Sequence, residues 1–245
     1  MNVEERERYA RHILLKEIGG PGQQQLKAAT VALVGMGGLG APAALYLAAA
    51  GVGALRLIDD DIVSLSNLQR QVLYRSDEVG APKIARAEAA LSALNPHAAI
   101  ETRNARLTEA NAHDLLIGAD LVLDGTDDFA TRFAVNAACR AMGIPLVSGA
   151  VGRWSGQVSV FQRGGPCYRC LVPEAPPDVE TCAAVGIVGA LPGVIGSLMA
   201  LEAIKQIAGA GEPLIGRLLI YDGLKSEART AALPRDPACP VCGHE

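Results

Sequence analysis

Residues 30–40 read TVALVGMGGLG, a continuous apolar run that passes directly into a glycine-rich segment. The apolar run is typical of a buried parallel strand, and the residues that follow predict a helix over 39–50. In this strand–loop–helix context, Gly35, Gly37, Gly38 and Gly40 form the fingerprint of a nucleotide-binding turn. The glycines allow close backbone approach, and the helix N-terminus offers free N–H groups to a phosphate. The stretch therefore predicts a nucleotide-binding α/β fold, without separating NAD, FAD and ATP.

Strand and helix patterns continue to alternate on the C-terminal side of this loop. Strands are expected at 54–58, 98–102, 120–124 and 145–149, with helices at 81–94, 108–117 and 128–142. Such alternation implies right-handed crossovers and a Rossmann-like, doubly wound, mainly parallel sheet. After Trp154 the rhythm changes, and the patterns predict a hairpin strand at 157–161, a helix at about 189–208 and a strand at 217–222. We therefore expect antiparallel strands added to one side of the sheet.

The N-terminal residues predict a helical arm rather than part of the sheet. A charged amphipathic helix is expected over 3–18, ended by Gly19-Gly20-Pro21-Gly22, with a short helical stretch at 23–29. We expect one domain, comprising an arm (1–29), a nucleotide-binding half (30–150) and a C-terminal half (151–245).

Composition excludes several classes of protein. Half of the 245 residues are apolar, which suits a sheet covered by helices on both faces, and the net charge of −4 argues against a nucleic-acid or anionic-membrane partner. The charged N-terminus does not resemble a signal peptide, and no apolar run is expected to span a bilayer. The expected location is the cytoplasm, where paired cysteines indicate metal ligands rather than disulfides.

Polar side chains beyond the second strand favour a triphosphate over a dinucleotide. Asp59, at the tip of that strand, stands where a ribose-hydroxyl acceptor is expected, although Asp60 and Asp61 are alternatives. The residues that follow include two cations and two amides suited to phosphate binding: Asn67, Arg70, Gln71 and Lys83.

Asp127 follows another strand, at the edge where open α/β sheets place their ligands. Its carboxylate is a candidate Mg²⁺ ligand beside substrate phosphates. Alternatively, Asp127 or Asp128 caps the helix that follows, and both roles are compatible if Asp128 is the cap.

Two Cys-x-x-Cys pairs predict a metal site in the C-terminal half. Cys167 and Cys170 form the first pair, and Cys239 and Cys242 form the second. Four thiolates make a closed site that suits structural Zn²⁺, because no ligand position is left for water. Cys139, within an expected helix, is interpreted as a core residue.

These motifs together resemble the MoeB/ThiF family, the bacterial relatives of ubiquitin-activating enzymes. The resemblance runs from Arg8-Tyr9-x-Arg11 to the final Cys-Pro-Val-Cys-Gly, and its most specific part is the string around Arg70. It implies that ATP and Mg²⁺ adenylate the C-terminal glycine of a ubiquitin-fold sulfur carrier, which residues 151–245 would help to bind. The carrier would be MoaD-like, as in molybdopterin synthesis, or alternatively ThiS-like, as in thiazole synthesis.

The resemblance also implies roles that the residues alone do not. It implies a homodimer in which Arg11 acts in trans on the nucleotide of the other subunit, and a separate sulfur-donor protein that acts in a later step. Cys182 corresponds to a sulfur-transfer or conjugating cysteine found in parts of the family. Asp128 departs from the family's common Thr-Asp-Asn, which leaves the assignment of individual carboxylates open.

Two other functions explain less of the chain. An NAD-dependent oxidoreductase accounts for the glycine loop and Asp59, but gives no role to Arg70, Lys83 or Arg11. A non-catalytic scaffold for ubiquitin-fold proteins does not require an intact phosphate site. Nucleotide preference separates the first alternative from an adenylyltransferase, and pyrophosphate exchange separates the second.

Overall fold

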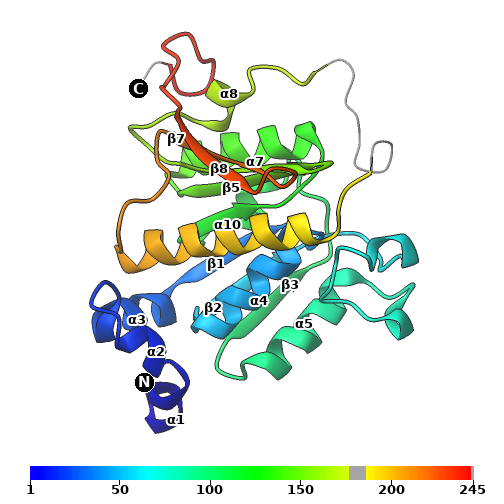
Figure 1. Cartoon of the computed structure of the whole chain (residues 1–245), viewed down its shortest axis with the longest axis vertical. Coiled ribbons are helices and arrows are strands. Elements are labelled where there is room, and N and C mark those ends of the chain that lie inside the picture. Colours follow the sequence, from blue (N-terminus) through cyan, green and yellow to red (C-terminus); the bar gives the residue numbers. More distant parts are fainter. Residues whose placement is uncertain (177–185, 244–245) are drawn as a thin grey trace.

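The structure is a computed structural model that describes residues 1–176 and 186–243 (Figure 1). An eight-stranded sheet crosses the molecule in the order β3-β2-β1-β4-β5-β6-β7-β8. The strands are β1 (Thr30–Val34), β2 (Ala54–Ile58), β3 (Ala99–Arg103), β4 (Leu121–Asp124), β5 (Leu146–Gly152), β6 (Ser155–Phe161), β7 (Arg217–Asp222) and β8 (Glu227–Ala232). β3, β2, β1, β4 and β5 pair in parallel, whereas β5 to β8 pair antiparallel. The expected fold class is confirmed.

Helices cover both faces of this sheet. They are α1 (Val3–Arg8), α2 (Ala10–Ile13), α3 (Gly19–Ala28), α4 (Gly40–Ala50), α5 (Lys83–Leu94), α6 (Ala112–Leu116), α7 (Phe129–Met142), α8 (Tyr168–Leu171) and α10 (Ala190–Ala208), with 3₁₀ turns η1 (Leu65–Asn67) and η2 (Ser76–Glu78). Val31 and Leu33 of β1 belong to a core shared with α4, α5 and α10, whereas Ala32 and Val34 belong to one shared with α6 and α7. Alternate residues of the strand thus fill the cores on opposite faces.

The strand order identifies the edge of the sheet at which a ligand is expected to bind. β1 lies between β2 and β4, so successive connections leave it in opposite directions. The carboxyl end of β1 is therefore a topological switch point, where open α/β sheets bind ligands. The glycine loop, Asp59 and Asp127 all follow strands that end at this edge.

The N-terminal arm differs from the expected form. The helix predicted over 3–18 is divided into α1 and α2, and the prediction that Gly19–Gly22 ends a helix is wrong, because α3 begins at Gly19. Pro21 lies in the first turn of α3, where proline removes no intrahelical hydrogen bond.

The long helix α10 meets the length and composition test for a membrane-spanning helix, contrary to the expectation that no segment would. In the structure, 44% of its apolar segment is buried, and Leu191, Ile195 and Met199 lie in the core shared with α4. Figure 1 shows α10 lying across the sheet beside α4. Its hydrophobicity is therefore used, at least in part, for packing within the fold.

Candidate nucleotide site and cysteine cluster

The glycine loop connects β1 to α4 by backbone that needs glycine at two positions. Gly35 has a φ of +86°, in the left-handed region that favours glycine. At Gly40, a Cβ would lie 1.8 Å from the carbonyl oxygen of Gly35. Gly35, Gly37 and Gly38 line a cavity at the sheet edge, whereas Gly40 is buried and provides the close approach of helix to loop.

We expect Gly40→Ala to remove nucleotide binding. The added methyl group would overlap the Gly35 carbonyl oxygen, so the loop or the start of α4 must shift, at a cost of about 3 kcal/mol. Thermal unfolding and ATP titration of the variant test this expectation. Gly20→Ala is a matched control, because no atom lies within 4 Å of a Cβ at that position. Wild-type ATP affinity in Gly40→Ala would contradict the assigned packing role.

Asp59 and Tyr74 hold the glycine loop from two sides. The Asp59 carboxylate accepts hydrogen bonds from the backbone N–H groups of Met36, at 2.7 Å, and Asp61, at 2.8 Å. The Tyr74 hydroxyl donates to the Met36 carbonyl oxygen at 2.6 Å. Burial raises the pKa of Asp59, an effect that the positive charge of Lys83 and these two N–H groups oppose. Asp59 is thus anchored beside the loop, and the sequence analysis missed the part played by Tyr74.

The predicted phosphate-binding residues surround the same cavity. Arg70 is half-buried and donates to the Ser66 carbonyl oxygen at 3.0 Å. Lys83 is buried and forms an ion pair with Asp61 at 2.9 Å. The side-chain oxygen of Gln71, also buried, has no hydrogen-bond partner among the described residues. A buried acceptor without a partner indicates a place where a ligand or water completes the hydrogen bonding.

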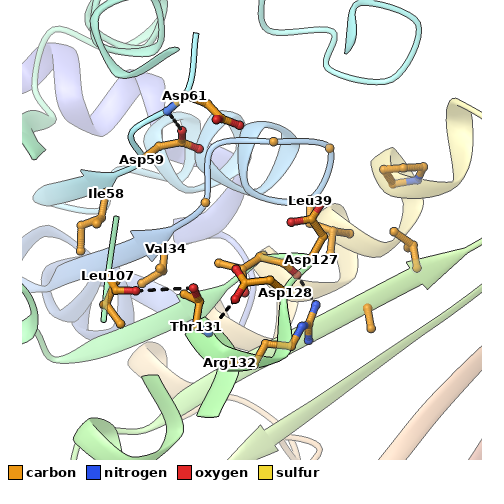
Figure 2. A pocket seen from close by; sticks show the side chains of 18 of the residues that line it. Val34, Leu39, Ile58, Asp59, Asp61, Leu107, Asp127, Asp128, Thr131 and Arg132 are labelled. Atoms are coloured by element: carbon orange, nitrogen blue, oxygen red, sulfur yellow. Dashed lines mark hydrogen bonds between the residues drawn. The ribbon is translucent and has the colours of Figure 1, made fainter. Parts of the chain in front are cut away.

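Asp127 and Asp128 have different environments (Figure 2). Asp128 is the N-cap of α7 and accepts a hydrogen bond from the Thr131 N–H at 2.8 Å, so the expected capping role is confirmed. Asp127 is exposed, lines the cavity, and makes no hydrogen bond or salt bridge within the described part of the chain. Its carboxylate is therefore available to a metal ion, and hard oxygen ligands of this kind suit Mg²⁺.

Arg132 is a buried cation that the sequence analysis did not identify. Its guanidinium donates to the carbonyl oxygens of Thr126 and Gly149, the latter at 2.8 Å, and lies 3.8 Å from the Asp124 carboxylate. Burial disfavours the charged form, but the negative charge of Asp124 raises the pKa of Arg132 overall. The signal available in the sequence was an arginine on the apolar stripe of an expected helix, in line with Val135 and Cys139.

Together these residues enclose a cavity of about 420 Å³, within the size range of small-molecule sites. The predicted residues that line it are Gly35, Gly37, Gly38, Asp59, Asp61, Asn67, Arg70, Gln71, Lys83 and Asp127. Arg106, which pairs with Asp60 at 3.4 Å, is a further cation in the lining. Arg11 is exposed on α2 and does not line the cavity of its own chain, and Cys182 lies outside the described residues.

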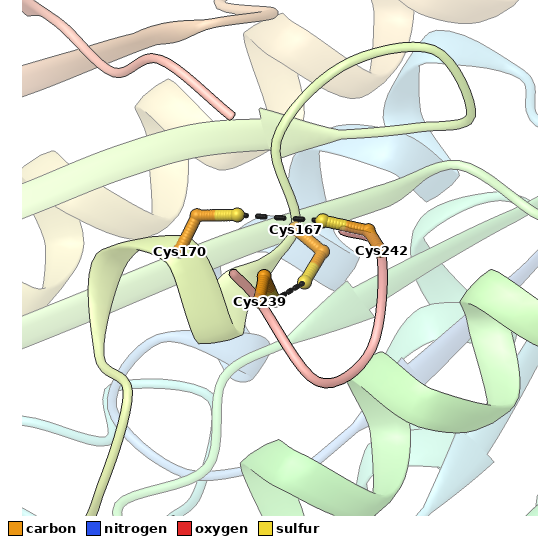
Figure 3. A group of neighbouring side chains, drawn as sticks. All are labelled: Cys167, Cys170, Cys239 and Cys242. Atoms are coloured by element: carbon orange, nitrogen blue, oxygen red, sulfur yellow. Dashed lines mark hydrogen bonds between the residues drawn. The ribbon is translucent and has the colours of Figure 1, made fainter. Parts of the chain in front are cut away.

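The four paired cysteines converge as predicted (Figure 3). All four sulfur atoms lie within 4.8 Å of one another, with Cys167 and Cys239 separated by 3.6 Å and Cys170 and Cys242 by 3.4 Å. A tetrahedral zinc site with Zn–S bonds of about 2.3 Å requires S···S separations of about 3.8 Å. The cluster therefore fits structural Zn²⁺, which would tie the C-terminal tail to α8. Cys139 is separate from it and is a core residue, and burial raises the pKa of its thiol.

Comparison with known proteins agrees with this site. Residues 9–241 match the ThiF family. The chain is 48% identical to the sulfur carrier protein adenylyltransferase of Thermus thermophilus, over 99% of this chain and 92% of that protein. It is 49% identical to the molybdopterin-synthase adenylyltransferase of Escherichia coli, over 96% of each chain. The structure of E. coli MccB with AMPCPP and MccA is 25% identical and superposes with a TM-score of 0.85, covering 96% of this chain and 74% of MccB.

Proposed function

Because the chain belongs to the ThiF family, we propose that it uses ATP to adenylate the C-terminal glycine of a ubiquitin-fold sulfur carrier, most specifically a MoaD-like protein. The single observation that carries this proposal is the cavity, which is lined by a glycine loop, Arg70, Lys83 and an Asp127 carboxylate that has no hydrogen bond or salt bridge among the described residues. Relatives at 48% and 49% identity are named for adenylation of a sulfur carrier and of molybdopterin synthase. An oxidoreductase is therefore no longer a competing explanation of the glycine loop.

The reaction joins two negatively charged groups. The terminal carboxylate of the carrier attacks the α-phosphorus of ATP, a new C–O–P linkage forms, and the bond to the β-phosphate breaks as pyrophosphate leaves with the electron pair. A carboxylate is already ionised at neutral pH, so no general base is required. The protein must instead neutralise the phosphates and hold the reactants in line.

The cavity residues suit this electrostatic task. We assign Arg70 and Lys83 to the phosphates, the former as a planar bidentate donor and the latter as a point charge. Asn67 and Gln71 are uncharged groups that can donate to phosphate oxygens or orient the cations. Asp127 would hold a Mg²⁺ ion, which would supply charge neutralisation of the phosphates when bound.

A homodimer is the second part of the proposal. Leu14 and Leu15, close to Arg11 in the chain, are exposed, as are Tyr46 of α4 and Leu201 of α10, two helices that pack together. Exposed apolar side chains mark a protein–protein interface when they form one contiguous patch. We assign these side chains to contact with a second subunit, whose Arg11 would serve the cavity that Arg11 does not line in its own chain.

Carrier-dependent exchange of ³²P-pyrophosphate into ATP tests the proposed reaction. The assay is run in parallel with MoaD-like and ThiS-like proteins ending in Gly-Gly. Exchange with the MoaD-like protein alone supports the specific proposal, and exchange with the ThiS-like protein alone moves the enzyme to thiazole synthesis. Absence of exchange with either carrier, from folded and zinc-loaded protein, would favour a non-catalytic scaffold.

We expect Cys182→Ala to retain pyrophosphate exchange within about twofold of wild type. The nucleophile of adenylation is the carrier's own carboxylate, so a thiol has no part in that step, although it could act in later sulfur transfer from a separate donor protein. The exchange assay with purified carrier measures this directly. Loss of exchange would assign Cys182 a role in adenylation itself.

A further inference from the structure

The cysteine cluster and the nucleotide cavity share a residue, Tyr168. The helical turn α8 (Tyr168–Leu171) begins directly after Cys167 and includes Cys170, so Tyr168 lies within the Cys-x-x-Cys turn. Its side chain is only 3% exposed and lines the nucleotide cavity. The metal-binding turn thus contributes part of the cavity wall, and Tyr168 has a place beyond general packing.

Tyr168 is held in a defined orientation. Its backbone N–H donates to the Asn136 side-chain oxygen at 2.8 Å, which fixes the turn against α7. Its ring meets Phe161 edge-on, with centroids 6.0 Å apart, and lies 5.9 Å from Phe133. The flanking Cys167 and Cys170 belong to the four-cysteine cluster. A metal ion joining those cysteines to Cys239 and Cys242 would therefore fix the backbone on both sides of the ring.

The Tyr168 ring also lies close to Arg132. The guanidinium carbon of Arg132 lies 5.7 Å from the centre of the Tyr168 ring, within cation–π range. Both side chains are buried, and a buried cation depends on each of its partners more strongly than an exposed one. A shift of the ring would therefore change the position or the hydration of the guanidinium.

Arg132 in turn holds the loop that carries Asp127. It donates to the carbonyl oxygen of Thr126, the residue just before Asp127, and to that of Gly149 in β5. It also faces Asp124 at the end of β4. A continuous chain of contacts therefore runs from the cysteine cluster through Tyr168 and Arg132 to the proposed metal ligand of the ATP site.

We propose that Tyr168 is a positioning residue that couples zinc occupancy of the cysteine cluster to ATP affinity, acting through Arg132 on the loop of residues 124–127. The inference rests on the proposed function, because it concerns the affinity of that ATP site. Zinc then does more than anchor the C-terminal tail: it sets the geometry of the nucleotide cavity. Arg169, the neighbour of Tyr168 in the same turn, reaches this chain of contacts only through Phe133, because its guanidinium lies over that ring, 3.8 Å from the ring centre, and it does not line the cavity.

Calorimetric titration with ATP and Mg²⁺, without carrier, tests the coupling. Wild type, Tyr168→Leu and Arg169→Leu are each measured with zinc bound and after chelation, with zinc content determined in every sample. We expect zinc removal to weaken ATP binding to wild type about tenfold, and Tyr168→Leu to weaken it about tenfold with zinc still bound. In Tyr168→Leu, zinc removal should cause little further loss, because the connection is already broken. Arg169→Leu should keep the wild-type affinity and the full response to zinc.

Amide hydrogen exchange provides a readout independent of affinity. Residues 124–128 should exchange faster in zinc-loaded Tyr168→Leu than in zinc-loaded Arg169→Leu, and equal exchange in the two variants would overturn the step from Tyr168 to the loop even if the zinc-free protein unfolds. Unchanged ATP affinity after zinc removal from folded wild type would overturn the proposal. The proposal would also be overturned if zinc-free Tyr168→Leu bound ATP about a hundredfold more weakly than zinc-loaded wild type. In that case the effects of the substitution and of zinc removal would multiply, as independent effects do. Failure of zinc-loaded wild type to bind ATP would instead refute the proposed function.

Discussion

Arg70→Ala is expected to reduce carrier-dependent pyrophosphate exchange by at least about a hundredfold while leaving the fold intact. Arg70 faces the cavity from the segment after η1, and its one hydrogen bond within the described residues is to the Ser66 carbonyl oxygen. No carboxylate in the described part of the chain forms a salt bridge with Arg70, so its charge remains available to phosphate. Its removal takes away transition-state stabilisation without breaking a buried ion pair. Exchange rates and thermal unfolding are measured on the same preparation.

Two further variants sharpen this test. Arg75→Ala is the matched control, because Arg75 lies five residues along the chain, pairs with Asp77 at 3.2 Å and does not line the cavity. It should retain wild-type exchange. Arg70→Lys keeps the charge but loses planar bidentate geometry, so it should recover only part of the activity. Normal exchange in Arg70→Ala would remove Arg70 from the phosphate site.

The sheet could be predicted because its signals are local and mutually consistent. The apolar run at 30–34 and the glycines after it occur in β1 and the loop, and each expected parallel strand is found within three residues of its predicted bounds. β8 was missed because Glu227–Ala232 reads EARTAA, with almost no buried side chain to create a strand pattern. It is a strand because it completes a hairpin with β7, which is a tertiary effect.

The site was predictable where a side chain directly follows a strand or belongs to a recognisable motif. Asp59 and Asp127 follow β2 and β4, whereas Arg70 lies in the specific string and Lys83 begins α5 after Gly80-x-Pro82, and all four line the cavity. Tyr168 was not among the residues predicted for the site, because nothing in its local sequence reveals that the turn between two cysteines reaches the nucleotide site. Its partnership with Arg132 depends on the packing of α8 against α7, and sequence spacing does not show such a contact.

The structure also gives different roles to neighbouring carboxylates whose individual assignments the sequence left open. Asp128 caps α7. Asp59 accepts hydrogen bonds from two backbone N–H groups and so positions the glycine loop. Asp61 is engaged with Lys83, an ion pair that bound phosphates would compete for. Asp127 has no such structural task within the described residues, which strengthens its assignment as the Mg²⁺ ligand.

Mixing two inactive variants is expected to restore activity if Arg11 acts across a subunit interface. Arg11→Ala and Arg70→Ala homodimers should each have almost no exchange activity, since every site lacks one cation. In a heterodimer, the Arg11→Ala subunit keeps its own Arg70 and receives Arg11 from its partner, so one of the two sites is complete. Random reassociation of equal amounts makes about half of the dimers heterodimers, and the mixture should therefore recover about a quarter of wild-type activity.

This recovery depends on which subunit's nucleotide Arg11 contacts, not on the total number of cations in the dimer. If Arg11 served the nucleotide of its own subunit, each heterodimer would contain one site lacking Arg11 and one lacking Arg70, and mixing would restore nothing. Arg11 is exposed on α2 and does not line the cavity of its own chain, so a role of Arg11 at a nucleotide would require a second subunit. Sedimentation of the mixture establishes the dimer, and Arg8→Ala mixed with Arg70→Ala is the control, because the Arg8 side chain donates to the Leu94 carbonyl oxygen of its own chain. Arg8→Ala alone should retain exchange, which would show that the effect belongs to Arg11 and not to loss of any cation from the N-terminal arm.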